Sequence, residues 1–447
     1  MLVGTVVVTA LFAAALVTWQ IATGGDDGTT ARTAPSWSSI AVVDRVTGDV
    51  TYIGPDGDVV GTSEANGRTG SVHGVGGSLT LISSQRAAVL PPPNSEDAAL
   101  VVEMPRGATV GPVAGGDVTY LAVGTTTGGN VIVLDPAAAT AYDIGALVAG
   151  TLPSTPAMRV DTLRTNRDGS IIAVADVTNF QTIVVQPDTT VPVFLPDQPV
   201  AAGDDLVATS QTVGTQADVA LVALDGSTKA SVPTEIPVGG VFDDDRFVFV
   251  SIDGGVFGVE PGDDEADQIG VISIPVDGTI AWARPASDGR RLVVTSETFE
   301  AVVDLDGETL FSTTFAGPVE AVAPDPDWAC LPVGGTGGSH SIIDLDTGEQ
   351  LADLTGLTIT GVADHGCAVL ADRNGIASVV TGDGVAVLGR VTSSLIGPDG
   401  RSVVRTTADG ITELVLLGDD LAITDTIDIT EAIDGANPLI TFVTSID

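Results

Sequence analysis

The residues of this chain best placed for chemistry are its two cysteines, Cys330 and Cys367. Each stands three positions after an aspartate, in Asp327-Trp-Ala-Cys and Asp364-His-Gly-Cys, so the two occupy matching positions in successive sequence units. A disulfide between them would join neighbouring units in an oxidising compartment and add roughly 3 to 4 kcal/mol of stability. The alternative is two separate small buried residues, because a bridge needs Cα atoms within about 7 Å of each other.

Metal and nucleophile chemistry finds little support in the sequence. The three histidines, His73, His340 and His365, are scattered and lack the spacing of zinc ligands. Acidic runs at 243–245, 263–265 and 304–308 offer the oxygen ligands that calcium takes, but none has a complete calcium-loop spacing, and solvated turns are the favoured interpretation. Neither a Gly-x-Ser-x-Gly elbow nor a phosphate-binding loop is present. We therefore predict no catalytic residues, and calcium is the one cofactor left open.

One local basic patch stands out, formed by Arg159, Arg164 and Arg167. These side chains could face an anionic ligand from a loop, although pairing with the abundant carboxylates is the favoured alternative. The chain has 17 basic and 59 acidic residues, a formal net charge of −42. Such a surface repels nucleic acid, which we exclude as a partner.

The first segment of the chain differs from the rest. Residues 1–22 contain an uncharged apolar run from Leu2 to Ala22, long enough for a transmembrane anchor, and Trp19 would lie near an interface. A signal peptide is the main alternative, although a basic start is missing, and a buried helix is a further one. Residues 23–37 have the composition of a flexible linker. We expect the following domain, residues 38–447, to lie outside the cytoplasm at the cell membrane.

The elements that position these residues are short strands that recur at about 40 residues. An Asp-Gly turn opens a strand, as at Asp399-Gly400, and an acidic turn separates two further strands, as at Asp344. Four antiparallel strands per unit without crossover helices predict an all-β fold, a single β-propeller of about eight blades, with seven to ten allowed. A β-solenoid is the alternative. The irregular stretch 54–116 is interpreted as padding, and the strand near 439–444 is expected to complete the sheet of the hairpin at 40–53.

The repeats resemble those of known propellers. Gly-Pro-Asp-Gly-Arg at Gly397 resembles TolB-like and WD40-like repeats, and the Asp-x-x-Thr-Gly turns at Asp44 and Asp344 resemble YVTN and PQQ-type repeats. The tryptophan that follows this turn in PQQ-type repeats is missing after Gly48 and Gly348. The resemblance implies a rigid platform whose loops or channel recognise something, without a quinone cofactor.

The sequence therefore favours a membrane-anchored binding or scaffold module for a protein or envelope component. The alternative is a metal-dependent hydrolase or lactonase-like enzyme, with carboxylates at the propeller channel.

Overall fold

The computed structural model describes residues 37–64, 67–75, 78–83, 86–93, 95, 98–104, 109–115, 118–124, 132–135, 140–151, 160–186, 191–275, 278–286, 289–316, 319, 328–334, 340–433 and 438–444. They belong to one compact unit, Pro35–Asp447. The expected anchor, residues 1–22, and nearly all of the expected linker lie outside the described residues. Among the helices that are described, none has the length and apolar character needed to cross a membrane.

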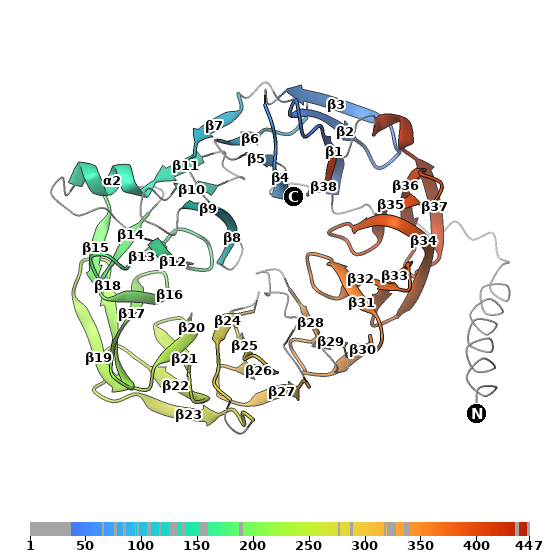
Figure 1. The fold of residues 1–447 in the computed structure, drawn as a ribbon. Helices are drawn as coiled ribbons and strands as arrows, with labels where there is room; N and C mark the ends of the chain where they lie inside the picture. The colour runs from blue at the N-terminus through green and yellow to red at the C-terminus, as the bar shows by residue number, and fades with distance from the viewer. Residues whose placement is uncertain are drawn as a thin grey trace, which may run out of the picture. The chain divides into compact units, whose positions relative to one another are not determined.

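The described strands form antiparallel sheets that we number 1 to 10 along the chain and describe from the inner to the outer strand (Figure 1). Sheet 1 contains β38 (Leu439–Thr444), β1 (Trp37–Val43), β2 (Asp49–Ile53) and β3 (Val59–Glu64). Sheet 2 contains β4 (Ser71–Val75), β5 (Ser78–Ile82), β6 (Arg86–Leu90) and β7 (Leu100–Glu103). Sheet 3 contains β8 (Thr109–Gly115), β9 (Val118–Gly124), β10 (Ile132–Asp135) and β11 (Thr140–Asp143).

Sheets 4 to 7 follow the same order. Sheet 4 contains β12 (Val160–Thr165), β13 (Ile172–Asp176), β14 (Gln181–Val185) and β15 (Val193–Pro196). Sheet 5 contains β16 (Gln198–Ala202), β17 (Leu206–Val213), β18 (Gln216–Ala223) and β19 (Thr228–Thr234). Sheet 6 contains β20 (Pro237–Asp243), β21 (Arg246–Ser251), β22 (Gly255–Val259) and β23 (Asp267–Val271). Sheet 7 contains β24 (Trp282–Pro285), β25 (Arg291–Thr295), β26 (Phe299–Asp304) and β27 (Thr309–Thr314).

The last three sheets depart slightly from this pattern. Sheet 8 has β28 (Cys330–Val333), β29 (Ser341–Asp344) and β30 (Gln350–Asp353) among the described residues. Sheet 9 has β31 (Thr358–Val362), β32 (Ala368–Arg373), β33 (Ile376–Thr381) and the first half of β34 (Gly384–Ile396). Sheet 10 has the second half of β34, then β35 (Ser402–Thr407), β36 (Thr412–Leu417) and β37 (Ile423–Asp428). The helices described are α2 (Ile144–Thr151) and the 3₁₀ turn η1 (Thr430–Ala432).

The hydrophobic core is divided among the interfaces between consecutive sheets. Nine of the ten buried clusters of the described residues each join two neighbouring sheets, from sheets 1 and 2 through to sheets 9 and 10. The remaining cluster joins sheet 10 to sheet 1, where Leu414 and Leu416 pack with Trp37 and Ile40. Every sheet is therefore covered on both faces, which gives the propeller-like ring of Figure 1.

The first and last described strands close this ring, as predicted. β38 pairs antiparallel with β1, and Val43 lies opposite Leu439. The single value of about eight blades is too low, because the described residues form ten sheet units, at the upper limit of the expected range. The error comes from the stretch 54–116, which forms β3, all of sheet 2 and β8 of sheet 3 instead of padding. The strand β1 also begins at Trp37, the last residue of the expected linker.

The Asp-Gly turns act as scaffold, as the sequence indicates. Asp399 Oδ1 accepts the backbone N–H groups of Arg401 and Ser402 at 3.0 and 2.9 Å, and Gly400 has φ +68°. Trp37 Nε1 in sheet 1 donates to Ser402 Oγ at 2.9 Å and to Asp399 Oδ2 at 3.2 Å. One turn of sheet 10 thus binds its own backbone and the neighbouring sheet.

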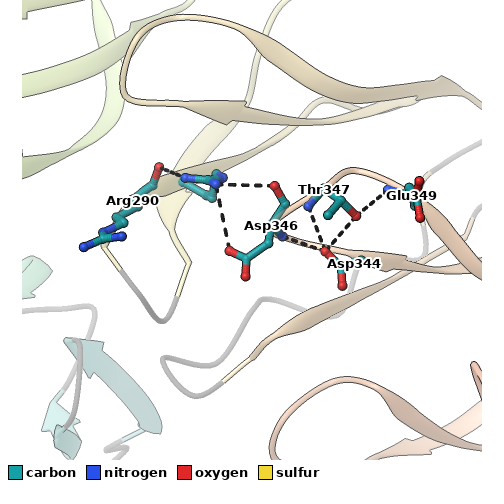
Figure 2. Close-up of polar contacts among 6 residues, drawn as sticks. Arg290, Asp344, Asp346, Thr347 and Glu349 are labelled. Carbon is teal, nitrogen blue, oxygen red and sulfur yellow. Dashed lines mark hydrogen bonds and ion pairs between the residues drawn. The ribbon is translucent and has the colours of Figure 1, made fainter.

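The acidic turn at Asp344 has the same double use (Figure 2). Asp344 Oδ1 accepts from the N–H groups of Asp346 and Thr347 at 2.9 and 2.8 Å. From sheet 7, Arg291 Nη2 reaches the Asp346 carbonyl oxygen at 3.3 Å. The turn at Asp344 in sheet 8 therefore also contacts sheet 7.

Candidate functional site

The two cysteines lie in adjacent sheets and are bonded. Cys330 begins β28 in sheet 8 and Cys367 directly precedes β32 in sheet 9, and their Cα atoms are 4.8 Å apart. The backbone N–H of Cys330 also donates to the His365 carbonyl oxygen at 3.1 Å. A Cβ on Gly366, which has φ +73°, would overlap the carbonyl oxygen of Cys330. The disulfide therefore closes a tight junction between two sheets.

The histidines have structural surroundings. His365 Nδ1 accepts the N–H of Cys367 at 3.1 Å, and His340 Nδ1 lies 3.1 Å from the Leu357 carbonyl oxygen. His73 lies in sheet 2, where burial lowers the pKa of its imidazole. The three imidazole groups thus lie in different parts of the propeller and do not form one site.

The acidic runs considered for calcium form turns. Asp304 Oδ1 accepts the N–H groups of Asp306 and Glu308 at 3.0 and 2.8 Å, and Asp263 Oδ2 accepts the N–H of Glu260 at 2.7 Å. Within the part of the chain that the structure describes, no three His, Cys, Asp or Glu side chains converge as a metal site would require.

The predicted arginine patch is divided by the fold. Arg159 lies outside the described residues, whereas Arg164 lies on β12 and Arg167 in the exposed turn after it. Arg164 Nε donates to the Val200 carbonyl oxygen at 3.0 Å, and Nη1 donates to the Leu163 carbonyl oxygen at 3.1 Å. The pairing of β16 with β17 shifts register between Pro199 and Ala201, a bulge that leaves the Val200 carbonyl available. Arg164 thus links the inner strands of sheets 4 and 5.

A second arginine, Arg284, lies on β24 in sheet 7. Burial, and then the charge of Arg284, lower the pKa of Arg164 to about 10. Arg284 is itself exposed, and its Cζ lies 5.1 Å from the ring centroid of Trp282, a cation–π contact. Sequence reasoning missed Arg284 as a partner of Arg164. The recurrence of Arg two residues before the turn, in Arg164-Thr-Asn166 and Arg284-Pro-Ala286, could have revealed it.

A buried carboxyl group was also missed. Glu300, the second residue of β26, is 1% exposed. Neither carboxyl oxygen has a hydrogen-bond partner of normal geometry among the described residues. Burial raises the pKa of Glu300 to about 8, and the nearby backbone N–H of Gly334 opposes this only in part. Glu300 is therefore mostly protonated at neutral pH.

Exposed apolar side chains follow a pattern set by the strand order. We call the turn between the second and third strands of a sheet the middle hairpin. Because the described sheets share one strand order around the ring, their middle hairpins emerge on one face. Five large apolar side chains in or beside these hairpins are exposed: Val46, Phe180, Val213, Ile376 and Ile411. The other exposed large apolar residues of the described chain lie on outer strands or lead into them: Val59, Val60, Val101, Val191, Val271, Leu351, Val385 and Ile423.

Comparisons with known proteins do not supply a family. No protein-family model matches the chain, and no curated protein matches its sequence. Among solved structures, the dihydro-heme d1 dehydrogenase NirN in complex with DHE is 18% identical, covers 73% of this chain and 75% of its own, and has a TM-score of 0.43. A structure described as the eukaryotic initiation factor is 10% identical, covers 92% of this chain and 100% of its own, and has a TM-score of 0.46. Similarities of this degree carry no information about function.

Proposed function

We propose that the chain is a membrane-anchored, extracytoplasmic binding module that holds a protein or envelope component on its middle-hairpin face. The observation that carries the proposal is the row of exposed apolar side chains on that face. Ile376, Ile411 and Val46 belong to sheets 9, 10 and 1, which are consecutive around the ring. Exposed apolar side chains on consecutive sheets of one face can supply the apolar part of an interaction surface.

Two further features support the proposal. The Cys330–Cys367 disulfide is of the kind that persists in oxidising compartments, in agreement with a domain outside the cytoplasm. The net charge of −42 favours a partner with an apolar centre and a basic rim, because charge complementarity speeds encounter and selects partners.

The proposal is tested by capture from envelope fractions with the full chain in a non-ionic detergent. The triple variant Val46→Ser, Ile376→Ser, Ile411→Ser removes the consecutive apolar tips. The matched control, Val101→Ser, Val271→Ser, Ile423→Ser, removes equally exposed residues from outer strands. We expect a partner that the wild type and the control enrich and the tip variant loses. Equal recovery by both triple variants would exclude the middle-hairpin face as the binding surface.

A further inference from the structure

The middle hairpin of sheet 4 ends in an exposed phenylalanine with an unfavourable backbone conformation. Phe180, directly before β14, is 77% exposed and has φ +52°. Bulky side chains are rare at such a φ, which glycine, asparagine and aspartate adopt more easily. The other non-glycine residues with positive φ in the described chain are Asp197, Asp244, Asn374 and Leu421, and Leu421 packs in the buried cluster of sheets 9 and 10. Neither turn chemistry nor burial accounts for Phe180, and outliers of this kind concentrate at functional positions.

A buried carboxylate holds this hairpin in shape. Asp176, the last residue of β13, is fully buried. Its Oδ1 accepts the backbone N–H groups of Thr178 and Asn179 at 3.1 and 3.4 Å, and its Oδ2 accepts the side-chain amide of Gln181 at 3.2 Å. Residues on both sides of Phe180 are thus tied to one carboxylate. The phenyl ring projects from a fixed backbone, which reduces the entropy lost when a partner binds.

The middle hairpin of sheet 5 stands beside this one. Gln198, the first residue of β16, donates from Nε2 to the Asp176 carbonyl oxygen at 3.4 Å, and it lies opposite Ser210 of β17. Beyond Ser210 the hairpin extends past the packed part of its sheet, because residues 211–216 are all exposed. Val213 at its tip is 64% exposed. Two exposed apolar tips therefore project from neighbouring hairpins of one face.

The charge distribution around these tips is unusual for this chain. Residues 177–186 and 206–217 contain no Asp, Glu, Lys or Arg, although the net charge is −42. Carboxylates return at the base of the hairpins, where Asp218 lies opposite Gln211 and Asp197 directly precedes β16. An uncharged centre that contains an aromatic residue, with a charged rim, is the composition of a protein–protein interface. The complementary surface has an apolar pocket and a basic border.

The rest of the face argues against a lipid surface as the occupant. Other middle hairpins carry exposed carboxylates, such as Asp253 in sheet 6, Glu297 in sheet 7 and Asp409 in sheet 10. A flat membrane surface would approach these carboxylates together with the tips and desolvate them, which is unfavourable. A protein that takes the two tips into a pocket avoids this cost.

We infer that Phe180, together with Val213, is an anchor by which the middle-hairpin face docks a protein whose apolar pocket is bordered by lysine or arginine side chains. The inference rests on the proposed binding function of that face and adds a contact point at sheets 4 and 5. Phe180 fills the pocket and Val213 covers its edge, while Asp197 and Asp218 face the basic border. A buried aromatic anchor of this kind supplies much of the binding energy of an interface.

Photocrosslinking of the full chain tests the inference. The probe p-benzoylphenylalanine replaces Phe180, and the protein is illuminated in membranes of the cells that produce it. A matched protein carries the probe in place of Val101, an exposed residue of the outer strand β7. We expect the probe at position 180, and not the one at 101, to attach to one protein at apolar residues next to lysine or arginine. Attachment to lipid alone, attachment to a second copy of this chain alone, equal attachment from both positions or no attachment would overturn the inference.

Calorimetry with the attached protein, once purified, measures the contribution of the anchor. Phe180→Asn should weaken binding at least tenfold, about 1.4 kcal/mol. Its melting temperature should equal or exceed that of the wild type, because asparagine tolerates positive φ. Val101→Ser should keep wild-type affinity. Normal binding by Phe180→Asn would overturn the inference, and so would a lower melting temperature, since phenylalanine would then serve the fold.

The two proposals fail in different ways. If the triple variant of Val46, Ile376 and Ile411 loses its partner while Phe180→Asn binds normally, the proposed function stands and the anchor is refuted. If both triple variants recover the partner equally while position 180 attaches specifically, the row of tips is refuted and the anchor stands.

Discussion

Replacement of Glu300 by Gln should remove a pH-dependent destabilisation from the protein. The carboxyl is 1% exposed and lacks a hydrogen-bond partner of normal geometry among the described residues. Its pKa rises from 4.5 to about 8 on burial. Between these two values the folded protein holds a proton that the unfolded chain has lost, so stability falls as the pH rises. Glutamine keeps the shape of the side chain and does not titrate.

The size of the effect follows from the pKa difference. Each unit between the two pKa values contributes about 1.4 kcal/mol. The Glu300 carboxyl therefore costs about 1 kcal/mol at pH 5 and about 3 kcal/mol at pH 7, and the cost levels off above pH 8. Glu300→Gln also buries an amide, but that contribution is constant with pH. The stability difference between variant and wild type should thus grow by about 2 to 3 kcal/mol from pH 5 to pH 7.

The assay is urea unfolding of the full chain, followed by tryptophan fluorescence at a series of pH values from 5 to 8.5. Glu297→Gln, in the exposed turn before β26, controls for the loss of one negative charge. Glu300→Gln should diverge from both the wild type and this control as the pH rises. Parallel curves for all three proteins across this range would refute the reasoning, because Glu300 would then ionise in the folded state as it does in the unfolded chain.

Three further predictions concern the junctions between sheets. Ellman titration of the denatured, non-reduced protein should find no free thiol, and two free thiols would contradict the disulfide. The double variant Cys330→Ala, Cys367→Ala should lower the free energy of unfolding by up to about 4 kcal/mol, because the bridge spans a sequence separation of 37 residues. Gly366→Ala should lower the free energy of unfolding by clearly more than the roughly 1 kcal/mol expected for Gly375→Ala. Both glycines have positive φ, but an added Cβ meets the Cys330 carbonyl oxygen only at Gly366. Equal melting temperatures of the two variants would count against this close approach. Trp37→Phe should lower stability by about 1 to 2 kcal/mol through loss of its bonds to Asp399 and Ser402; an unchanged unfolding midpoint would show that these bonds are dispensable.

Turn chemistry made much of the fold predictable from sequence. Asp399 and Asp344 bind backbone N–H groups within a few residues, so their role is visible in the local pattern. The turn pattern did not predict the sheet between residues 54 and 116, because sheet 2 forms without a clear Asp-Gly turn at its start. There the strands are fixed by the neighbours that cover their faces, and Leu79 and Leu81 pack with Tyr52 of sheet 1.

The candidate site depends on relations that a single sequence does not display. Arg164 stands out in a local basic patch, but the charge that helps to lower its pKa belongs to Arg284, 120 positions later in the chain. The two arginines also stand at equivalent positions of their inner strands, opposite Ala173 and Val293, and this equivalence becomes visible only when the strands are aligned. Glu300 follows the buried Phe299, so the alternation of side chains along β26 places it on the opposite face of sheet 7. A one-sided sheet would expose that face to solvent, but here sheet 8 covers it.

The pairing of β38 with β1 sets the order in which the protein can mature during synthesis. Nine sheets can form as the chain emerges, but sheet 1 lacks its inner strand until residues 439–444 arrive. Until then β1 exposes an unpaired edge, and the apolar surfaces later buried between sheets 10 and 1 remain open. The pairing of β38 with β1 joins residues at opposite ends of the domain, so it is a late step in folding. Before that step, the exposed edge and apolar surfaces leave the chain prone to aggregation. The arrival of residues 439–444 therefore decides when β1 gains its partner and the ring can close.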